Sequence, residues 1–467
     1  MLLLLTAVAA AGCKTYTDRV SEAKNDVLAG RPKKALVDLN EALELEKSHQ
    51  LPAELSGENT LTVLERATVL QSVGRYKLAA RDMMIADQRL DWLDIATAKK
   101  AKLGKYLFSG SSVRYRAPPF ERLMLNTLNL LNFAALRDWE DAKVEARRFE
   151  LIEHFFAGQK RSELQPDVLA FGNYLGGAAF ETAGDYREAV RRYARAWHYG
   201  LRYDRFRQRL LHLIRMTAAD PSKYVADQSR ALSKLEEAAS SVDVLGAEAY
   251  RDRFVDGEAL IVFQTGMVPY KKAVRMPIAQ ALTYSQTHAY GAYHLSTDRR
   301  KRARELAASG ALKWVNFPEL TESGLPPDRQ VAATVDGRSL RLRGAVDVES
   351  QVEAAWKAIS GPLMAAAITR MITRAVAGAA TREGVEEASG DSTLGMLAQI
   401  AVEGGMAAAD KPDTRSWSML PARIRFARLS LEPGEYTVRA QIDGVTVRKT
   451  ADVREVGLEV VNFSRYR

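Results

Sequence analysis

The residue types that build most metal and redox sites are scarce in this chain. Its 467 residues include one cysteine, Cys13, and six histidines. A single cysteine excludes an intrachain disulfide and any metal site that needs two thiolates. No two histidines have the His-Glu-x-x-His spacing of zinc hydrolases, and the pair His288 and His294 would need further ligands to hold a metal. The sequence therefore predicts neither a metal nor a cofactor.

Familiar catalytic motifs are absent as well. The chain contains no G-x-S-x-G nucleophile motif and no P-loop lysine motif. Acidic residues are plentiful on the predicted helices. The sequence pattern of a catalytic carboxylate pair on a helix is the same as that of ordinary charged surface residues. The sequence therefore predicts a protein without enzymatic activity.

Long apolar segments are also missing. The N-terminal run Leu2–Ala11 is only ten residues long, whereas a membrane-spanning helix needs about 20. No later uncharged apolar segment is long enough to span a bilayer. Hydrophobic residues make up 47% of the chain and charged residues 27%, which is ordinary for a soluble protein body.

The N-terminal apolar run ends in the tetrapeptide Ala-Ala-Gly-Cys13. Small residues before a cysteine resemble the lipobox of bacterial lipoprotein signal peptides, although no Lys or Arg precedes the run. The resemblance implies that residues 1–12 are removed as a signal peptide and that Cys13 carries lipid. Because Lys14 rather than an acid follows, it also implies an outer-membrane location facing the periplasm. The alternative is an apolar N-terminus with an incidental cysteine.

The formal net charge is +9, and part of the excess is concentrated in one segment. Between Met267 and Arg304 there are eight basic residues against one acid, Asp298. Such a segment favours anionic partners. For an exported protein we expect phosphate-bearing lipid or an anionic envelope polymer rather than nucleic acid. The alternative is a solvated basic helix face around Arg299–Arg304 with a scaffold role.

The first half of the chain contains a degenerate helical repeat. Its clearest copy resembles the tetratricopeptide repeat, in which small residues let two helices cross while large ones fill the adjacent space. Its signature residues are Gly177, Phe180, Gly184, Tyr186, Ala189, Tyr193 and Ala196. Weaker copies surround the turns at Gly30, Gly74 and Asp138. We expect an irregular α-solenoid over residues 13–245, the alternative being a non-repetitive helical domain.

A central strand-containing domain is predicted over residues 246–347. Glu258–Gln264 has the composition of a buried strand, bounded by Gly266 and Pro269. Gln330–Arg343 is a predicted hairpin around the turn Asp336-Gly337, a dipeptide that tolerates the positive φ angles of a two-residue turn.

Packed helices rich in Ala and Gly are predicted over residues 348–410. The first is Val348–Ile359, the second begins at Pro362, and a third covers Gly390–Gly405. Period-two alternation then predicts a small antiparallel β module over residues 411–467. The expected fold class is therefore α+β, with a helical N-terminal half, a mixed central region and a C-terminal β module.

Two short motifs combine glycine, proline, charged and aromatic residues in a way that the packing of a scaffold does not require. One contains Gly266, Pro269 and Lys271, and the other contains Asp413, Arg415 and Trp417. Their order resembles that of an uncharacterised family of bacterial tetratricopeptide-repeat-containing envelope lipoproteins. In an extended segment the three residues of the second motif face one way, so the carboxylate can pair with the guanidinium. We expect a clasp between domains or, alternatively, a pocket for a polar ligand.

These expectations combine into one functional hypothesis. A lipid-anchored envelope protein would bind a periplasmic or outer-membrane protein partner through its helical repeats, in cell-wall or outer-membrane assembly. The alternative is a cell-wall ligand-binding or hydrolytic protein, with a cleft formed by the basic segment and the segment Asp413–Trp417.

Overall fold

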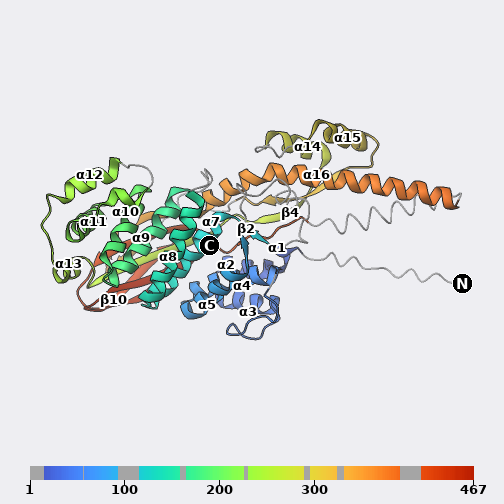
Figure 1. Ribbon diagram of the computed structural model, residues 1–467. Coiled ribbons are helices and arrows are strands. Elements are labelled where there is room, and N and C mark those ends of the chain that lie inside the picture. The colour runs from blue at the N-terminus through green and yellow to red at the C-terminus, as the bar shows by residue number, and fades with distance from the viewer. Residues whose placement is uncertain are drawn as a thin grey trace.

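The computed structural model describes residues 15–55, 57–92, 115–157, 165–225, 230–288, 295–322, 331–389 and 412–466. It has a mixed α+β fold, as predicted, with helices in the first half and antiparallel strands near the C-terminus. Figure 1 shows a layer of helices along the strands and a separate projection that contains α14, α15 and much of α16. Cys13, His294 and the predicted helix Gly390–Gly405 lie outside the described residues.

The helices of the first half pack in chain order, α2 on α3, α4 on α5, α7 on α8 and α9 on α10. Several of their connecting turns contain a glycine at positive φ, such as Gly74 at 78° and Gly184 at 86°, a conformation that costs glycine little. The elements are α1 (Tyr16–Arg19), α2 (Ser21–Leu28), α3 (Pro32–Ala42), α4 (Gly57–Ser72), α5 (Tyr76–Arg89), β1 (Asp91–Trp92), β2 (Arg116–Ala117), α7 (Pro119–Ala135), α8 (Trp139–Ala157), α9 (Pro166–Thr182), α10 (Tyr186–His198), α11 (Asp204–Thr217), the 3-10 helix η2 (Pro221–Tyr224), α12 (Arg230–Ala239) and α13 (Ala247–Phe254).

Two four-stranded sheets pack face to face beneath the helices. One has the order β12-β3-β9-β8 and the other the order β11-β10-β6-β7. Their strands are β3 (Glu258–Met267), β6 (Val331–Val335), β7 (Arg338–Ser339), β8 (Arg343–Asp347), β9 (Pro421–Ser430), β10 (Gly434–Ile442), β11 (Val445–Val453) and β12 (Leu458–Arg465). The first sheet also contacts the helices, since α4 and α7 lie against β12 and α9 lies against β8.

The predicted strand beginning at Glu258 is confirmed and continues to Met267 as β3. All ten of its residues are buried because both faces of the strand are covered. Leu260 and Val262 belong to the core shared with the helices, whereas Ile261 and Phe263 belong to the core between the two sheets. This strand is therefore the centre of a three-layer body.

The C-terminal strands share both sheets with the central region. β9 and β12 flank β3, and β10 pairs with β6. The pairing of β12 with β3 is parallel, whereas the neighbouring pairs are antiparallel. The strands β9 to β12 are thus part of a sandwich that β3, β6, β7 and β8 complete.

The predicted hairpin at Asp336-Gly337 is present but short. β6 and β7 pair antiparallel around this turn, with φ of 45° at Asp336 and 83° at Gly337. After two residues of β7 the chain crosses to the first sheet as β8. The segment between β7 and β8 therefore runs across one edge of the sandwich.

The prediction of a helix break at Pro362 is wrong. A single helix, α16 (Val348–Ser389), continues through this proline. Proline removes one backbone donor and often breaks a helix. Here Trp356 on one side and Met364 on the other pack in the same hydrophobic core, so tertiary packing holds the two halves together.

That second core belongs to a small lobe formed by the described residues 271–288 and 295–320, called here the basic lobe. It contains β4 (Lys271–Pro277), α14 (Ile278–Thr287), α15 (Thr297–Ala308) and β5 (Trp314–Leu320), all packed near α16. Within the described ranges, no helix has the length and apolar character that crossing a membrane requires.

Candidate functional site

The two motifs singled out in the sequence lie next to each other in the structure. The Lys271 side chain donates a hydrogen bond to the carbonyl oxygen of Arg415, with an N···O distance of 3.0 Å. The backbone N–H of Val268 donates to the carbonyl of Leu420 at 3.1 Å. The segment after Gly266 and the segment before β9 are therefore neighbours, although about 145 residues separate them in sequence.

The expected ion pair within the second motif is present. Arg415 donates from Nε and from one terminal nitrogen to the two carboxylate oxygens of Asp413, both at 2.7 Å. Trp417 is buried, and its indole N–H donates to the hydroxyl of Thr68 on α4 at 2.9 Å. The motif therefore connects the sandwich to the helical layer.

Two buried glutamates of the helical layer complete this clasp. Glu65 accepts from the backbone N–H of Ser418 at 2.6 Å and from that of Met419 at 2.7 Å. Glu121 accepts from the Tyr115 hydroxyl at 2.7 Å. Burial raises the pKa of both carboxyls to about 7, although these hydrogen bonds favour the charged form.

The cavity beside the clasp is small. Its volume is about 40 Å³, and Pro269, Lys271, Trp356 and Trp417 are among the residues that line it. Ligand sites usually have volumes of about 300–1,000 Å³, whereas a single water needs only about 10–15 Å³. Burial lowers the pKa of Lys271. This geometry is that of an interdomain clasp rather than a pocket for a sugar or a peptide.

The repeat-signature residues lie mainly in the helical core. Phe180, Ala189, Tyr193 and Ala196 are fully buried. A Cβ atom at Gly177 would collide with the ring of Tyr193, so the missing side chain is what permits α9 and α10 to approach each other. Gly184 forms the turn between these helices, and Tyr186 packs edge-on against the ring of Tyr250 at 5.5 Å.

The predicted basic segment does not converge on the clasp as a whole. Lys271 is at the clasp, whereas Arg299–Arg304 lie on α15 in the basic lobe. His288, which would have needed further ligands beside His294 to hold a metal, stacks on the ring of Tyr284 at 4.0 Å. Among the described residues, no group of three His, Cys, Asp or Glu is arranged to hold a metal ion.

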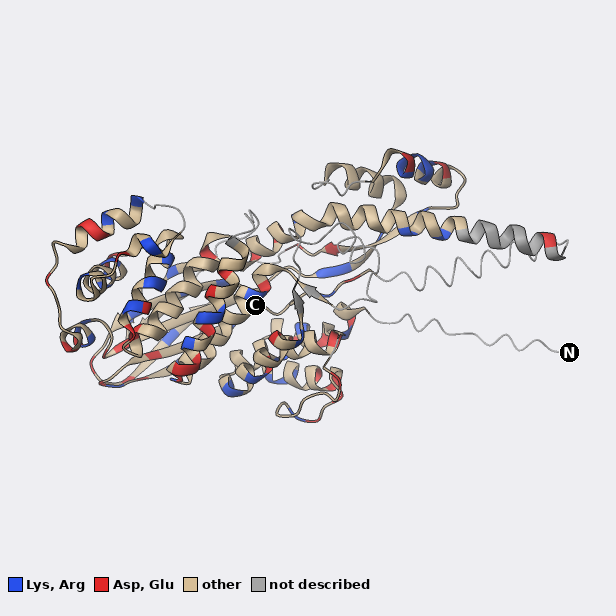
Figure 2. Cartoon of the chain, in the orientation of Figure 1, with Lys and Arg blue, Asp and Glu red and all other residues tan. Residues whose placement is uncertain are grey.

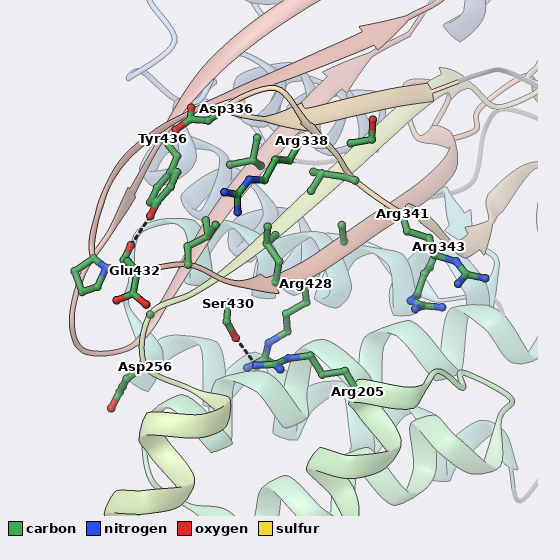
Figure 3. A pocket seen from close by; sticks show the side chains of 18 of the residues that line it. Arg205, Asp256, Asp336, Arg338, Arg341, Arg343, Arg428, Ser430, Glu432 and Tyr436 are labelled. Atoms are coloured by element: carbon green, nitrogen blue, oxygen red, sulfur yellow. Dashed lines mark hydrogen bonds between the residues drawn. The ribbon is translucent and has the colours of Figure 1, made fainter.

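A much larger cleft lies at the other end of the sandwich. Its volume is about 1100 Å³. Residues from the N-terminal end of α11, the segment from β6 to β8 and the turn from β9 to β10 form its walls (Figure 3). The arginines on these walls are Arg205, Arg338, Arg341, Arg343 and Arg428.

These arginines fall into two classes. Arg205 and Arg428 each lie 2.7 Å from the carboxylate of Glu258, and Arg428 also pairs with Glu181 at 2.9 Å. Arg338, Arg341 and Arg343 form no ion pair with any residue that the structure describes. Uncompensated positive charge therefore remains on the wall between β7 and β8.

That wall is ordered by stacking as well as by backbone pairing. The Arg343 guanidinium lies over the ring of Tyr203, 4.3 Å from its centroid, a favourable cation–π arrangement. Figure 3 shows Arg341 and Arg343 together at one end, with Arg338 nearer the middle of the cleft. The three guanidinium groups therefore come from one short segment and line the same cleft.

Five acidic residues also line the cleft, and three of them, Asp256, Asp336 and Glu432, lie at the end away from Arg341 and Arg343 (Figure 3). Asp336 accepts from the backbone N–H of Thr437 at 2.9 Å, and Asp256 pairs with Arg251 at 2.9 Å. Glu432 is also in this region (Figure 3). This polarity would direct an anionic group toward the arginine wall.

Sequence reasoning missed this cleft. It assigned residues 338–343 to a hairpin strand without considering their charge. The available signal was three arginines within six residues, two of them at alternate positions and hence on one side of an extended chain. The contribution of α11 to the site had no comparable signal.

Comparison with known protein families and with curated proteins finds no match for this chain.

Proposed function

We propose that this protein is a lipid-anchored envelope protein that binds an anionic ligand in the arginine-lined cleft without catalysing a reaction. The ligand would present phosphate or carboxylate groups, as an anionic envelope polymer does. The observation that carries this proposal is the set of three arginines on one wall, Arg338, Arg341 and Arg343, which lack ion-pair partners among the described residues.

The chemistry of guanidinium favours binding over catalysis. Its planar fork matches two oxygens of a phosphate or carboxylate group. It stays protonated at any physiological pH, so it does not act as a general base. In this proposal the helix pairs form an irregular tetratricopeptide-like solenoid around the sheet and thereby hold α11 against the cleft.

Binding of two labelled probes, short-chain polyphosphate and poly-L-glutamate, tests the cleft. We expect the triple variant Arg338→Gln, Arg341→Gln, Arg343→Gln to bind at least tenfold more weakly than the wild type, and added salt to weaken wild-type binding. The matched control is Arg299→Gln, Lys301→Gln, Arg304→Gln, which removes the same charge from α15. Equal loss in both variants, or no binding by the wild type, would contradict the proposal.

The anchor at Cys13 needs a separate test. Cells that express the wild type or Cys13→Ser are labelled with a palmitate analogue. We expect the wild type to carry the label and the variant to lose it. An unlabelled wild type would remove the anchor from the proposal while leaving the cleft measurements unaffected.

A second candidate function is the docking of an envelope protein on the helical layer. Since α4, α7 and α9 lie against the strands, the opposite side of the layer is the side that remains for a partner. On α8, three apolar side chains share one exposed face, Val144 at 40%, Leu151 at 70% and Phe155 at 52% exposure. An exposed apolar stripe of this kind is typical of interaction surfaces.

Site-specific photocrosslinking in intact envelopes tests this docking. A photoreactive residue replacing Leu151 is expected to give one discrete crosslinked product. The control is the same residue at exposed Arg187 on α10, which is expected to give none. Identical products at the two positions would contradict docking on α8.

A further inference from the structure

The basic lobe is a folded unit with its own core. Met276 of β4, Leu282 of α14, Leu306 of α15 and Phe317 of β5 pack together with Ile368 of α16. This core is distinct from the one shared by the helical layer and the first sheet. This core therefore holds the helices and strands of the lobe, and the side chains on their surface, in a defined arrangement.

The charges on this surface are strongly unbalanced. Residues 271–320 contain nine Lys and Arg against three Asp and Glu. On α15, Ala303 and Leu306 are buried, whereas Arg299, Lys301 and Arg304 are exposed. Figure 2 shows this basic helix on the outside of the projection. One face of α15 thus holds the helix to the lobe while basic residues point into solvent.

Few of these exposed charges are neutralised. Arg302 pairs with Glu305 at 3.2 Å, and both side chains are about half exposed. Arg299 reaches the hydroxyl of Thr369 on α16 at 3.5 Å, a neutral partner. Neither Lys301 nor Arg304 has an ion pair in the described structure. The positive potential of α15 is therefore available to a partner.

An exposed tryptophan lies in the same lobe. Trp314 at the start of β5 is 42% exposed, and the Arg275 guanidinium lies 5.4 Å from the centre of its ring. Tryptophan beside basic residues is the composition that favours the headgroup region of a bilayer. Aromatic and electrostatic features thus occur together in the lobe.

The path of the chain also brings the lobe toward the expected anchor. The Thr17 hydroxyl donates to the carbonyl of Lys271, the first residue of β4, at 2.6 Å. Thr15 is the N-cap residue of α1, the helix that contains Thr17. Cys13 precedes Thr15 by two residues in the sequence. A lipid on Cys13 would therefore hold the base of the lobe close to a membrane.

We propose that the basic lobe is a docking surface for an anionic phospholipid bilayer, with α15 providing the charge and Trp314 the interfacial side chain. In the cell this contact would orient a protein already attached through Cys13, so the cellular role rests on the proposed anchor. The vesicle contact itself does not, because it is measured on a chain that carries no lipid. The arginine-lined cleft would then point away from the membrane, since α11 and β10 lie at the opposite end of the molecule from α15 (Figure 1).

Vesicle co-sedimentation of the Cys13→Ser chain tests the proposal. The vesicles contain either a mixture of phosphatidylglycerol and phosphatidylethanolamine or phosphatidylcholine alone. We expect binding to the anionic vesicles to exceed binding to the neutral ones and to fall with salt. Adding Arg299→Gln, Lys301→Gln and Arg304→Gln is expected to weaken anionic binding about a hundredfold, given the usual contribution of each basic residue near a charged membrane.

The matched control removes three charges elsewhere, through Arg338→Gln, Arg341→Gln and Arg343→Gln. It is expected to keep vesicle binding and to lose polyphosphate binding, whereas the α15 variant should show the reverse. Three results would overturn docking on a bilayer: equal binding to both vesicle types, equal loss in both variants, or loss of polyphosphate binding alone in the α15 variant. Circular dichroism confirms that both variants are folded.

Discussion

The main body and the basic lobe use charged residues in opposite ways. In the body, Arg209 and Arg428 are buried between Glu181 and Glu258, with ion-pair distances from 2.6 to 2.9 Å. In the lobe, most charged side chains of α15 are exposed, and Lys301 and Arg304 have no ion pair with any residue that the structure describes. The difference separates charges that hold the layers together from charges that lie in solvent.

The buried network connects the helical layer to the first sheet at one place. Glu181 comes from α9, Arg209 from α11, Glu258 from β3 and Arg428 from β9. Burial opposes ionisation of Glu258, but the three neighbouring arginines outweigh it and lower its pKa to about 2. Removing one member would leave the others charged and uncompensated in the interior.

The largest expected effect is therefore that of Glu258→Gln. Breaking a buried ion pair from one side typically costs about 3–5 kcal/mol, and we expect a loss of that size in urea unfolding followed by circular dichroism. Since the carboxyl has a lowered pKa, its stabilising effect is present above about pH 4.5 and should disappear as the pH falls toward 2. A variant as stable as the wild type would contradict the assignment of this network as structural.

The clasp should show the opposite pH dependence. Glu121 has its pKa raised from 4.5 to about 7, so the unfolded chain releases this proton first as the pH rises. Stability should therefore decline between these two values, by up to about 3 kcal/mol at 1.36 kcal/mol for each pKa unit. Glu121→Gln should reduce this decline, and the contribution of Glu65, which has the same sign, should remain. An unchanged profile of stability against pH would count against the clasp.

A smaller loss is expected from Gly177→Ala. The added methyl group meets the ring of Tyr193, which is itself held by a hydrogen bond from its hydroxyl to Glu181 at 2.8 Å. Overpacking of this kind usually costs about 1–3 kcal/mol. Gly344→Ala is the control, because no atom lies within 4 Å of its added carbon. Equal thermal midpoints for the two variants would argue against close packing of α9 on α10.

The smallest effect is expected in the basic lobe. Arg299→Gln, Lys301→Gln and Arg304→Gln together should leave the thermal midpoint nearly unchanged, because exposed charges contribute at most about 1 kcal/mol each. Differential scanning calorimetry measures this directly. A decrease in thermal midpoint as large as that caused by Glu258→Gln would mean that the α15 charges stabilise the fold, which would contradict the contrast with the body.

Features determined by neighbouring residues could be predicted from the sequence. The turn at Asp336-Gly337 and the strand beginning at Glu258 depend on local conformation and on a short apolar pattern. The Asp413–Arg415 pair also involves residues only two apart. In each case a few adjacent side chains contain the required information.

Features that depend on distant contacts could not be predicted in this way. Trp417 forms a hydrogen bond with Thr68, which is 349 residues away in the sequence. The helix α16 continues through Pro362 because other segments of the chain pack on it in a common core. The cleft likewise joins Arg205 of α11 to Arg343 of β8. No local pattern indicates which of these remote elements meet.

The distance in sequence between β12 and the helices that it covers has a consequence for folding during synthesis. β12 covers part of α4 and α7, yet it is separated from them by more than 300 residues of chain. During synthesis, the apolar side of these helices emerges long before the strand that shields it. We therefore expect chaperones to occupy that side in the interval, and chains truncated before β12 to remain chaperone-bound or to be degraded.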